Sequence, residues 1–380
     1  MTSTDRCKVA GNSIQASRIG EYQVSITRLE KNTDLATDWL KLEKQVNPSI
    51  FTSWLWISTW LDQIAPPPAL LAKVYANQEI VALGVFILKK ETRYSLLSSN
   101  TARLHQTGLE HEDQVWIEYN ALLASPEHKI PALLAVERVL FNEGYCDELK
   151  ISMLSTTPDS SAYLDRENVN VDLEVVGYKR NLALCRQKKA TVLQAVSSNT
   201  RQQIRRSMRL YSEQFGKPTI LDAQTAEEAL RMFDEAGSFH KQRWIDSGFH
   251  NAAFTDFHKD LIKRGFDHGN IRLSQLHVGN RLLGVFYFMI YGNTAYFYLQ
   301  GLRHENNGKL KPGLCGHSLL MQDFLDQGVD EYDFMGGDSQ YKQQLADCKN
   351  AFVSVRTHNG DWKFLIEDGA RHLKRLMFKH

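Results

Sequence analysis

The sequence lacks an excess of charge of either sign. Its 380 residues include 45 lysines and arginines against 44 aspartates and glutamates, so the formal net charge is +1. Proteins dedicated to duplex DNA usually carry a clear basic excess, because they must neutralise backbone phosphates. The balance of charges therefore predicts that DNA is not a partner of this chain.

Cysteine is scarce and shows no paired spacing. The chain has five cysteines, at positions 7, 146, 185, 315 and 348, and no two of them form a CxxC motif. An odd number of widely spaced cysteines fits neither a disulfide framework nor a zinc site. We therefore expect reduced thiols, no metal ion and a cytoplasmic location.

Long apolar segments are also missing. The longest apolar runs, such as residues 281–291, are much shorter than the roughly 20 residues that a membrane-spanning helix needs. Residues 1–20 are polar, contain no apolar segment typical of a signal peptide, and are predicted to be disordered. Neither secretion nor membrane insertion is expected.

What the sequence does contain is an internal repeat. The tripeptide Gly-Val-Phe occurs at residues 84–86 and again at residues 284–286, within two apolar runs that each follow a turn signal. In each copy a second β-rich run follows, and then a Gly-Leu-x-His motif, at residues 108–111 and 301–304. A repeat of this length predicts two copies of one structural unit.

Apolar periodicity predicts the same order of elements in both halves, with helices first, then antiparallel strands, then a helix and a final strand. Helices are predicted at 34–45, 51–61, 130–142, 225–248, 255–265 and 313–326, and a short helix followed by a longer one is predicted within 190–215. Strands are predicted at 22–29, 70–76, 80–89, 93–98, 149–153, 182–185, 271–278, 282–291, 294–299, 331–335 and 351–357. The predicted fold class is α/β with a mixed, mostly antiparallel sheet. The predicted domains are residues 21–178 and 179–380, with a loop at 155–170 near their junction.

The start of one predicted helix has the features of an anion site. Pro312 and Gly313 open an apolar helix, and the first amides of a helix have no intrahelical partner and carry the positive end of its dipole. Three basic side chains flank this start, namely Arg303, Lys309 and Lys311. A pyrophosphate suits such a site, although Pro-Gly before a helix is also common as simple punctuation.

Four motifs in the second half carry a family resemblance. They are a serine followed by an Arg-rich helix at 198–206, the pair His240 and Arg243, a Lys-Pro-Gly turn at 311–313, and Asp-Phe-Met-Gly-Gly-Asp-x-x-Tyr-Lys at 333–342. With these motifs the chain resembles the tandem-GNAT acyltransferases of the CelD and Fem type. The resemblance extends from about residue 22 to residue 371 and is strongest in the second half.

The resemblance implies two GNAT folds that face each other, with the acyl donor bound by the second. The pantetheine arm of an acyl-CoA would lie between splayed strands at 296–300 and 332–335. The implied donor contacts are Gln300, Pro312, Gly313, Leu314, Cys315, Gly316, His317 and Lys342. The usual Gln/Arg-x-x-Gly-x-Gly loop of GNAT enzymes is absent. Within this family the Fem type uses aminoacyl-tRNA, whereas the CelD type is taken to use acyl-CoA.

The candidate catalytic residues lie in the same motifs. His240 suits a general base, since the reference pKa of histidine is about 6.5, and Arg243 lies one helical turn away, where it could contact a substrate. Asp338 is a second candidate base or a group that orients an amine, and Tyr341 is a candidate general acid for the leaving thiolate. Each also has an ordinary structural role, such as an ion pair between Asp338 and Lys342.

A basic helix face and the first half supply candidate substrate contacts. Four arginines share one side of a predicted helix, namely Arg201, Arg205, Arg206 and Arg209. They form either a solvated face or a clamp for an anionic substrate, with Arg205 as the candidate contact. The first half lacks the Pro-Gly helix start and the Gly-Gly-Asp motif, so we expect it to have lost the donor site and to form the acceptor wall. Its candidate contact is Glu110, with Asp113 and Glu118 nearby.

Three functions are compatible with these features. The leading hypothesis is an acyl-CoA-dependent N-acyltransferase acting on an amine, such as an amino sugar or another small-molecule or glycan precursor in exopolysaccharide biosynthesis. The first alternative is a Fem-like transferase that moves an aminoacyl group from tRNA to a cell-wall precursor, with tRNA as its partner. The second is a non-catalytic, GNAT-like accessory protein in polysaccharide biosynthesis. Monomer and homodimer are both expected states, because the duplication already mimics a dimer.

Overall fold

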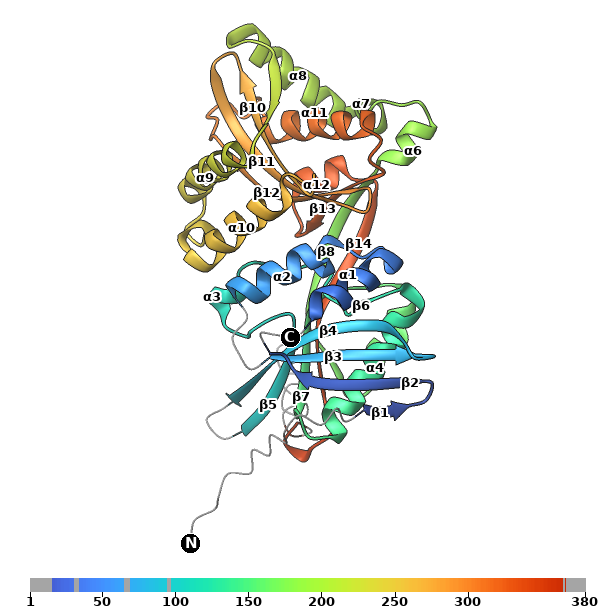
Figure 1. Ribbon diagram of the computed structural model, residues 1–380. Coiled ribbons are helices and arrows are strands. Elements are labelled where there is room, and N and C mark those ends of the chain that lie inside the picture. Colours follow the sequence, from blue (N-terminus) through green and yellow to red (C-terminus); the bar gives the residue numbers. More distant parts are fainter. Residues whose placement is uncertain (1–15, 31–33, 65–68, 94–96, 365, 367–380) are drawn as a thin grey trace, which may run out of the picture.

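Two lobes make up the molecule, and the structure, a computed structural model, describes residues 16–30, 34–64, 69–93, 97–364 and 366. The first lobe contains β1 (Ala16–Ile19), β2 (Tyr22–Arg28), α1 (Leu35–Val46), η1 (Ile50–Thr52), α2 (Trp54–Gln63), β3 (Ala69–Ala76), β4 (Glu79–Arg93), β5 (Leu97–Leu104), α3 (Glu110–Asp113), β6 (Leu123–Ala124), α4 (Pro126–Asn142), β7 (Glu148–Ser155), η2 (Pro158–Ser160) and α5 (Ser161–Leu164). The second contains α6 (Leu182–Gln187), α7 (Val192–Ala195), α8 (Ser198–Gln214), β9 (Pro218–Asp222), α9 (Ala226–Arg243), η3 (Gly248–His250), α10 (Ala252–Gly265), β10 (Ile271–Val278), β11 (Arg281–Tyr291), β12 (Thr294–Leu302), α11 (Pro312–Asp326), β13 (Glu331–Gly336) and α12 (Gln340–Leu345). Two long strands, β8 (Val169–Asn181) and β14 (Cys348–His358), connect the lobes (Figure 1).

One sheet runs through both lobes. In the described residues its strand order is β1-β2-β3-β4-β5-β7-β14-β8-β13-β12-β11-β10-β9, and β6 pairs with β4 outside this path. Strand β14, which follows the second lobe in the chain, lies between β7 of the first lobe and β8. The predicted boundary at 178/179 falls inside β8, so the two lobes share backbone hydrogen bonds at their junction.

The strand pattern repeats in the two lobes. In the first, β3, β4 and β5 are antiparallel neighbours, and β5 pairs in parallel with β7 at residues 101–103 and 148–150. In the second, β10, β11 and β12 are antiparallel neighbours, and β12 pairs in parallel with β13 at residues 294–296 and 331–333. A crossover helix joins each parallel pair, α4 in the first lobe and α11 in the second. The predicted duplication and the mixed, mostly antiparallel sheet are therefore confirmed.

The repeated glycines show where the two copies agree and where they diverge. Gly84 and Gly284 lie in the equivalent strands β4 and β11, and a Cβ atom at either would come within 2.4 Å of a leucine side chain. The later glycines differ. Gly301 lies inside β12, where a Cβ would meet the Ala236 carbonyl at 2.2 Å, whereas Gly108 follows β5 in a left-handed turn with φ +75°. The Gly-Leu-x-His motifs thus occupy different structural positions.

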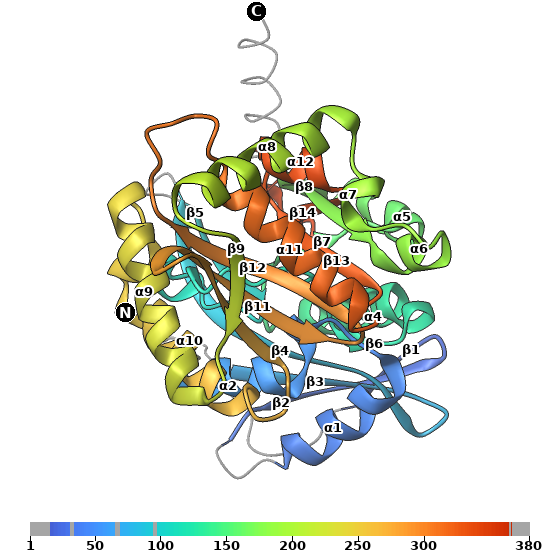
Figure 2. The same ribbon diagram turned by 90° about the horizontal axis from the view of Figure 1, so that it is seen from above.

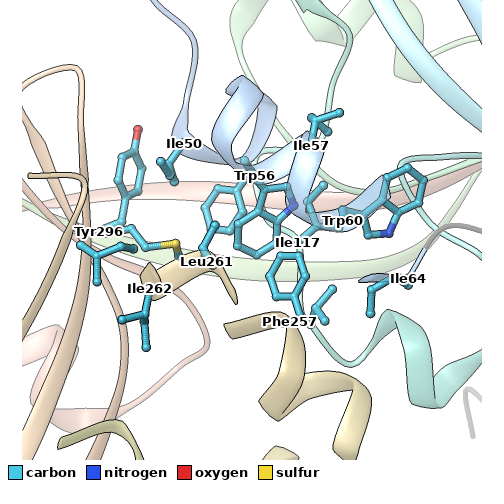
Figure 3. Packing of buried hydrophobic residues seen from close by; sticks show 14 of the residues in the cluster. Ile50, Trp56, Ile57, Trp60, Ile64, Ile117, Phe257, Leu261, Ile262 and Tyr296 are labelled. Carbon is cyan, nitrogen blue, oxygen red and sulfur yellow. The ribbon is translucent and has the colours of Figure 1, made fainter. Parts of the chain in front are cut away.

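A shared hydrophobic core fixes the lobes to each other. Helices α8 and α11 cover one face of the second lobe's strands, while α9 and α10 lie on the other, and α10 packs against α2 of the first lobe (Figure 2). In this core the rings of Trp56 and Phe257 lie 4.8 Å apart, and Ile117 and Tyr296 pack in the same cluster (Figure 3). Burial of each such side chain contributes about 1.5–3 kcal/mol. The walls of any cleft between the lobes are therefore held rigidly.

Some element predictions were wrong. Residues 182–185, predicted as a strand end, form α6, because the Asn181 side chain caps the helix by accepting from the Leu184 amide at 2.7 Å. Residues 16–19, predicted to be disordered, form β1 through antiparallel pairing with β2. The strand predicted at 93–98 corresponds to β5, which begins at Leu97, and residue 93 is the last of β4. The predicted loop at 155–170 contains η2, α5 and the first residues of β8.

The cysteines in the described residues are free. Cys146, Cys185 and Cys315 are buried and Cys348 is exposed, whereas Cys7 lies outside the described residues. Among the helices of the described ranges, none has the length and apolar character required to cross a membrane.

Candidate functional site

The second lobe has a wedge between two strands that start as neighbours. Strands β12 and β13 pair only through residues 294–296 and 331–333 and then diverge. Beyond that point β13 bends, with Met335 at φ 60° and Gly337 at φ 105°. A cleft of about 960 Å³ opens from this wedge, bordered by β12, the end of β13 and the starts of α11 and α12. The expected splaying of these two strands is present.

The start of α11 forms one wall of the cleft. The helix begins at Pro312, and its N-cap, Lys311, makes no side-chain capping bond. Pro312, Gly313 and Leu314 line the cleft. The first intrahelical bond runs from the Cys315 amide to the Lys311 carbonyl at 3.0 Å, so the Gly313 and Leu314 amides have no partner within the helix.

Gln300 lies opposite this helix start. It lines the cleft from β12, and its Oε1 atom is enclosed yet has no hydrogen-bond partner among the described residues. A Cβ atom built on Gly313 would lie 3.8 Å from this oxygen and 3.2 Å from Leu302. Gln300 and Gly313 thus border a narrow, polar space that contains a hydrogen-bond acceptor, Gln300 Oε1, left unpaired by the residues that the structure describes. Because buried polar atoms normally have a partner, this oxygen is suited to accept a hydrogen bond from a ligand.

The next turn of α11 does not reach the cleft. Cys315 and His317 are fully buried, and a Cβ atom on Gly316 would come within 2.2 Å of the Phe286 ring. The Nδ1 atom of His317 is hydrogen-bonded to the Tyr332 hydroxyl at 2.7 Å, and the Tyr341 ring stacks on the His317 ring. These three predicted donor contacts therefore pack the helix against the sheet and cannot touch a ligand in the cleft.

A buried serine holds the helix start in place. Ser207 of α8 accepts the Lys311 amide at 2.8 Å and the Cys315 thiol at 3.2 Å. Burial raises the pKa of Cys315 to about 11, so its thiol is protonated and inert at neutral pH. Ser207 lies on the apolar side of α8, one turn beyond Ile204, and no local pattern indicated its role.

The centre of the cleft is a contact between the lobes. Glu118 of the first lobe is half-buried, lines the cleft, and accepts the Gly336 amide at 2.8 Å. Lys342 of α12 is buried and donates to the Gly336 carbonyl. Burial raises the pKa of Glu118 to about 7, and the charge of Asp333 adds to this, while the Gly336 hydrogen bond and the Lys342 ammonium oppose it. One residue of β13, Gly336, is thus held at its amide by the Glu118 carboxyl group and at its carbonyl by the Lys342 ammonium.

A second interlobe cluster lies behind this centre. Asp333 is fully buried, accepts the Met335 amide at 2.7 Å and the Tyr119 hydroxyl, and lies 3.4 Å from the Lys179 ammonium. Asn350 donates to the Tyr119 hydroxyl at 2.9 Å. Asp333 therefore fixes the bend of β13, and the motif Asp-Phe-Met-Gly-Gly-Asp has a conformational role at its first residue.

Other predicted residues do line the cleft. His240, at the end of α9, is half-buried, and its Nδ1 lies 2.8 Å from the Ser247 hydroxyl. Burial and the neighbouring Arg243 lower the pKa of His240, so it is neutral at pH 7. Arg243 is exposed and stacks over Trp244, with 5.3 Å between its guanidinium carbon and the ring centre. Tyr341 also lines the cleft, and burial raises the pKa of its hydroxyl.

Three predicted residues lie elsewhere. Asp338 is on the outer surface, where it accepts from the Tyr178 hydroxyl at 2.7 Å and from Gln343, and these bonds lower its pKa. Arg205 is exposed on α8, beside a separate depression of about 390 Å³. Glu110 is exposed on α3 and does not line the cleft. Asp338 and Glu110 therefore lack the position that a base or an acceptor contact needs.

The sequence predicted Glu110 as the acceptor contact and named Glu118, near Trp116, only as a neighbouring acid, whereas Glu118 and Trp116 are the residues at the cleft. Both line the cleft, and both come from the first lobe, in a segment without regular periodicity. Trp116 is 44 % exposed and packs on Phe254, with 5.3 Å between ring centres. The clustering of Glu118 with aromatic residues was the available signal.

Comparisons with known proteins agree with this geometry. Residues 198–343 match the family model described as "Acetyltransferase (GNAT) domain". No curated protein sequence matches the chain. Among solved structures, FemX is 12% identical, with 86% of this chain and 97% of that chain covered and a TM-score of 0.55.

Two further solved structures share the fold. L-PGS from Bacillus licheniformis is 10% identical, with 89% of this chain and 96% of that chain covered and a TM-score of 0.53. A conserved protein of unknown function from Bacteroides thetaiotaomicron VPI-5482 is 9% identical, with 87% and 99% covered and a TM-score of 0.51. At such identities the likeness concerns the fold. The chain therefore shares its overall fold with these proteins, and its residues 198–343 match the model of a GNAT acetyltransferase domain.

Proposed function

We propose that this protein transfers an acyl group from a CoA thioester to a primary amine. The observation that carries the proposal is the open wedge between β12 and β13, with the uncapped start of α11 at its edge. An extended donor that bears a diphosphate fits this combination, because the wedge can hold a narrow arm and the helix start attracts an anion.

The chemistry of the wedge supports an acyl-CoA donor. The Gly313 and Leu314 amides suit a pyrophosphate, and Lys311 at the same wall adds positive charge. The unpartnered Oε1 atom of Gln300 suits an amide N–H of the pantetheine arm. No side chain at Gly313 obstructs this path, and a Cβ there would already lie 3.2 Å from Leu302.

Three side chains have suitable roles in the transfer. The Lys342 ammonium would polarise the acyl carbonyl. The Tyr341 hydroxyl stays protonated at neutral pH because burial raises its pKa, so it can donate a proton to the leaving thiolate. Arg243 at the cleft wall would hold an anionic or polar part of a substrate, with the neutral His240 beside it.

The rim of the cleft supports an amino sugar or a glycan precursor as the acceptor. Trp116 and Trp244, one from each lobe, line the cleft and are 44 % and 52 % exposed. Exposed indole faces suit the apolar faces of sugar rings. A role in exopolysaccharide assembly would follow from such an acceptor, and the proposed donor places the protein in the cytoplasm.

Calorimetry of acetyl-CoA binding tests the donor assignment. Wild-type protein is expected to bind one equivalent, and Gly313→Glu to weaken binding by at least about 100-fold, since the new carboxylate would occupy the anion site and repel the phosphates. Gln327→Glu adds the same charge at the exposed far end of α11 and serves as the control. Equal affinity for wild type and Gly313→Glu, or no binding by wild type, would contradict the proposal.

The basic face of α8 favours a second candidate, an aminoacyl-tRNA donor. Arg205, Arg206 and Arg209 are exposed and border one depression on the outer surface of the second lobe. A tRNA that used this face would bind with an affinity that falls steeply with salt. Filter binding of aminoacyl-tRNA at 50 and 200 mM salt, with Arg205→Gln/Arg209→Gln as the variant, distinguishes the two donors.

Turnover separates both enzymes from a non-catalytic accessory protein. An accessory role predicts no amide product with either donor and an unchanged biological output after Lys342→Ala. An acyltransferase predicts amide product, measured by mass spectrometry, and its loss in this variant.

A further inference from the structure

A segment of the first lobe crosses into the site of the second. Residues 115–120 run from the cleft rim to the centre of the first lobe, and Ile117 packs in the core that both lobes share. Val115 accepts the Tyr298 hydroxyl at 2.6 Å, and Tyr119 donates to Asp333. These contacts on both sides hold Glu118 against β13.

We propose that Glu118 is the general base of the transfer, so that the first lobe completes the catalytic centre of the second. This inference rests on the proposed acyl transfer to an amine. Glu118 lines the cleft, is partly accessible from it, and is fixed by the 2.8 Å hydrogen bond from the Gly336 amide to its Oε2 atom. That bond uses one carboxylate oxygen, and the other can face an acceptor amine.

The alternatives in the cleft are less suited to the role. Asp333 is fully buried, with both oxygens engaged. Glu305 lines the donor end and forms an ion pair with Arg281 at 3.0 Å. Asp338 lies on the outer surface. His240 lies at the rim with Nδ1 held by Ser247.

The charges around Glu118 come from four packed elements. Asp333 of β13 raises its pKa, and Lys342 of α12 lowers it. Tyr298 of β12 is protonated, because burial and nearby charges that include Glu118 raise its pKa. Lys179 of β8 is held by Asp333 and Glu331.

Two further groups face the same cleft from α9, namely His240 and Arg243. Together, burial and the neighbouring charges give Glu118 a pKa of about 7. This value is close to neutral pH, where a general base works best.

The proposed transfer moves one proton from the amine to Glu118 and another from Tyr341 to the leaving thiolate. The lone pair of the neutral acceptor amine attacks the thioester carbonyl carbon, a C–N bond forms, and the C=O π pair moves to oxygen beside the Lys342 ammonium. The Glu118 carboxylate takes a proton from the attacking nitrogen. The tetrahedral intermediate then collapses, the C–S bond breaks with its electron pair on sulfur, and the Tyr341 hydroxyl protonates the thiolate. Glu118 then releases its proton to solvent, and the Tyr341 phenolate takes up a proton from solvent.

Kinetics of Glu118→Gln tests the role directly. A glutamine can still accept the Gly336 amide, so the fold and acetyl-CoA affinity measured by calorimetry are expected to stay unchanged. Acetyl transfer to glucosamine, ethanolamine and lysine, followed by chromatography of CoA and product between pH 6 and 9, is expected to fall at least about 100-fold in kcat/KM. The wild-type rate should rise with pH through about 7 as Glu118 ionises, and this rise should vanish in the variant. Glu110→Gln, outside the cleft, is the matched control.

A titration that needs no acceptor gives a second readout. In protein labelled with carboxyl-13C glutamate, the signal absent from Glu118→Gln should titrate near pH 7. Lys342→Met should move that midpoint upward, because it removes the opposing cation. A midpoint near the ordinary glutamate value of about 4.3 would overturn the proposal.

The outcomes separate the two levels of inference. Wild-type protein that binds no acetyl-CoA would contradict the proposed function and this role with it. Acetyl-CoA binding and turnover that Glu118→Gln leaves intact would overturn the role of Glu118 alone.

Discussion

The two lobes contain the same wedge, and only one is open. In the second lobe the gap between β12 and β13 leads into the cleft of about 960 Å³. In the first lobe, Asn120 fills the gap between β5 and β7. Its amide donates to the Met153 carbonyl at 3.2 Å, and its side chain donates to the Leu104 carbonyl at 2.9 Å.

The crossover helices α4 and α11 also differ, at their first residues. Both begin with proline, but Gly313 follows Pro312 in α11, whereas Glu127 follows Pro126 in α4. Hydrogen bonding of the Glu127 carboxyl to its own amide and to Ser125 lowers its pKa, so this group at the helix start is ionised at neutral pH. An acidic group there repels phosphate, so neither the gap between β5 and β7 nor the start of α4 has the features that we propose for a donor site.

One segment of the first lobe contains both the residue that fills the first wedge and two residues that line the cleft of the second lobe. Asn120 closes the first wedge, while Trp116 and Glu118, four and two residues before it, line the second. One segment of the first lobe thus closes one wedge and contributes to the lining of the other. The lobes are therefore structurally interdependent, and single substitutions can test what distinguishes the two wedges.

Asn120→Leu should have the largest effect on stability. The substitution preserves volume but leaves the Leu104 carbonyl and the His105 Nδ1–H without partners in a fully buried place. We expect a loss of about 2–4 kcal/mol in the free energy of unfolding, measured by urea denaturation. A change below about 0.5 kcal/mol would show that the first wedge does not depend on its plug.

Gln300→Leu is the matching change in the open wedge. Because Gln300 Oε1 has no partner among the described residues, its loss should change stability by less than about 1 kcal/mol. Acetyl-CoA affinity should fall about 5–10-fold by calorimetry, as expected for one lost hydrogen bond. A large loss of stability with unchanged affinity would mean that this residue supports the fold only.

Glu127→Gly should have the smallest effect. It gives α4 the same Pro-Gly start as α11, yet Asn120 still fills the adjacent wedge. The stoichiometry of acetyl-CoA binding should therefore stay at one per chain. A second equivalent bound by the variant would show that the helix start alone makes the site.

Local patterns predicted much of this arrangement, and long-range contacts account for the rest. The splayed strands and the start of α11 were predictable, because a repeat and a Pro-Gly helix start are local signals. His317 was misplaced because helical spacing puts it one turn beyond Gly313, and only the structure shows that Tyr341 covers it. Strand β8 alternates from Val169 to Val175 and could have been found.

The path of residues 108–124 could not be predicted in this way. Its hydrogen-bond partners include β4, β5, β7, β12 and β13, and of these strands only β5 is close to it in sequence. Glu118 therefore looks like an ordinary loop acid until both lobes are assembled around it.

Hydrogen exchange with and without acetyl-CoA tests the central claim most directly. Peptides that cover residues 300–316 are expected to gain protection on addition of acetyl-CoA, because the amides at the start of α11 would bind its pyrophosphate. Peptides from β5 and from the start of α4 are expected to stay unchanged. Protection absent from residues 300–316, or equal at the start of α4, would contradict a single donor site in the second lobe.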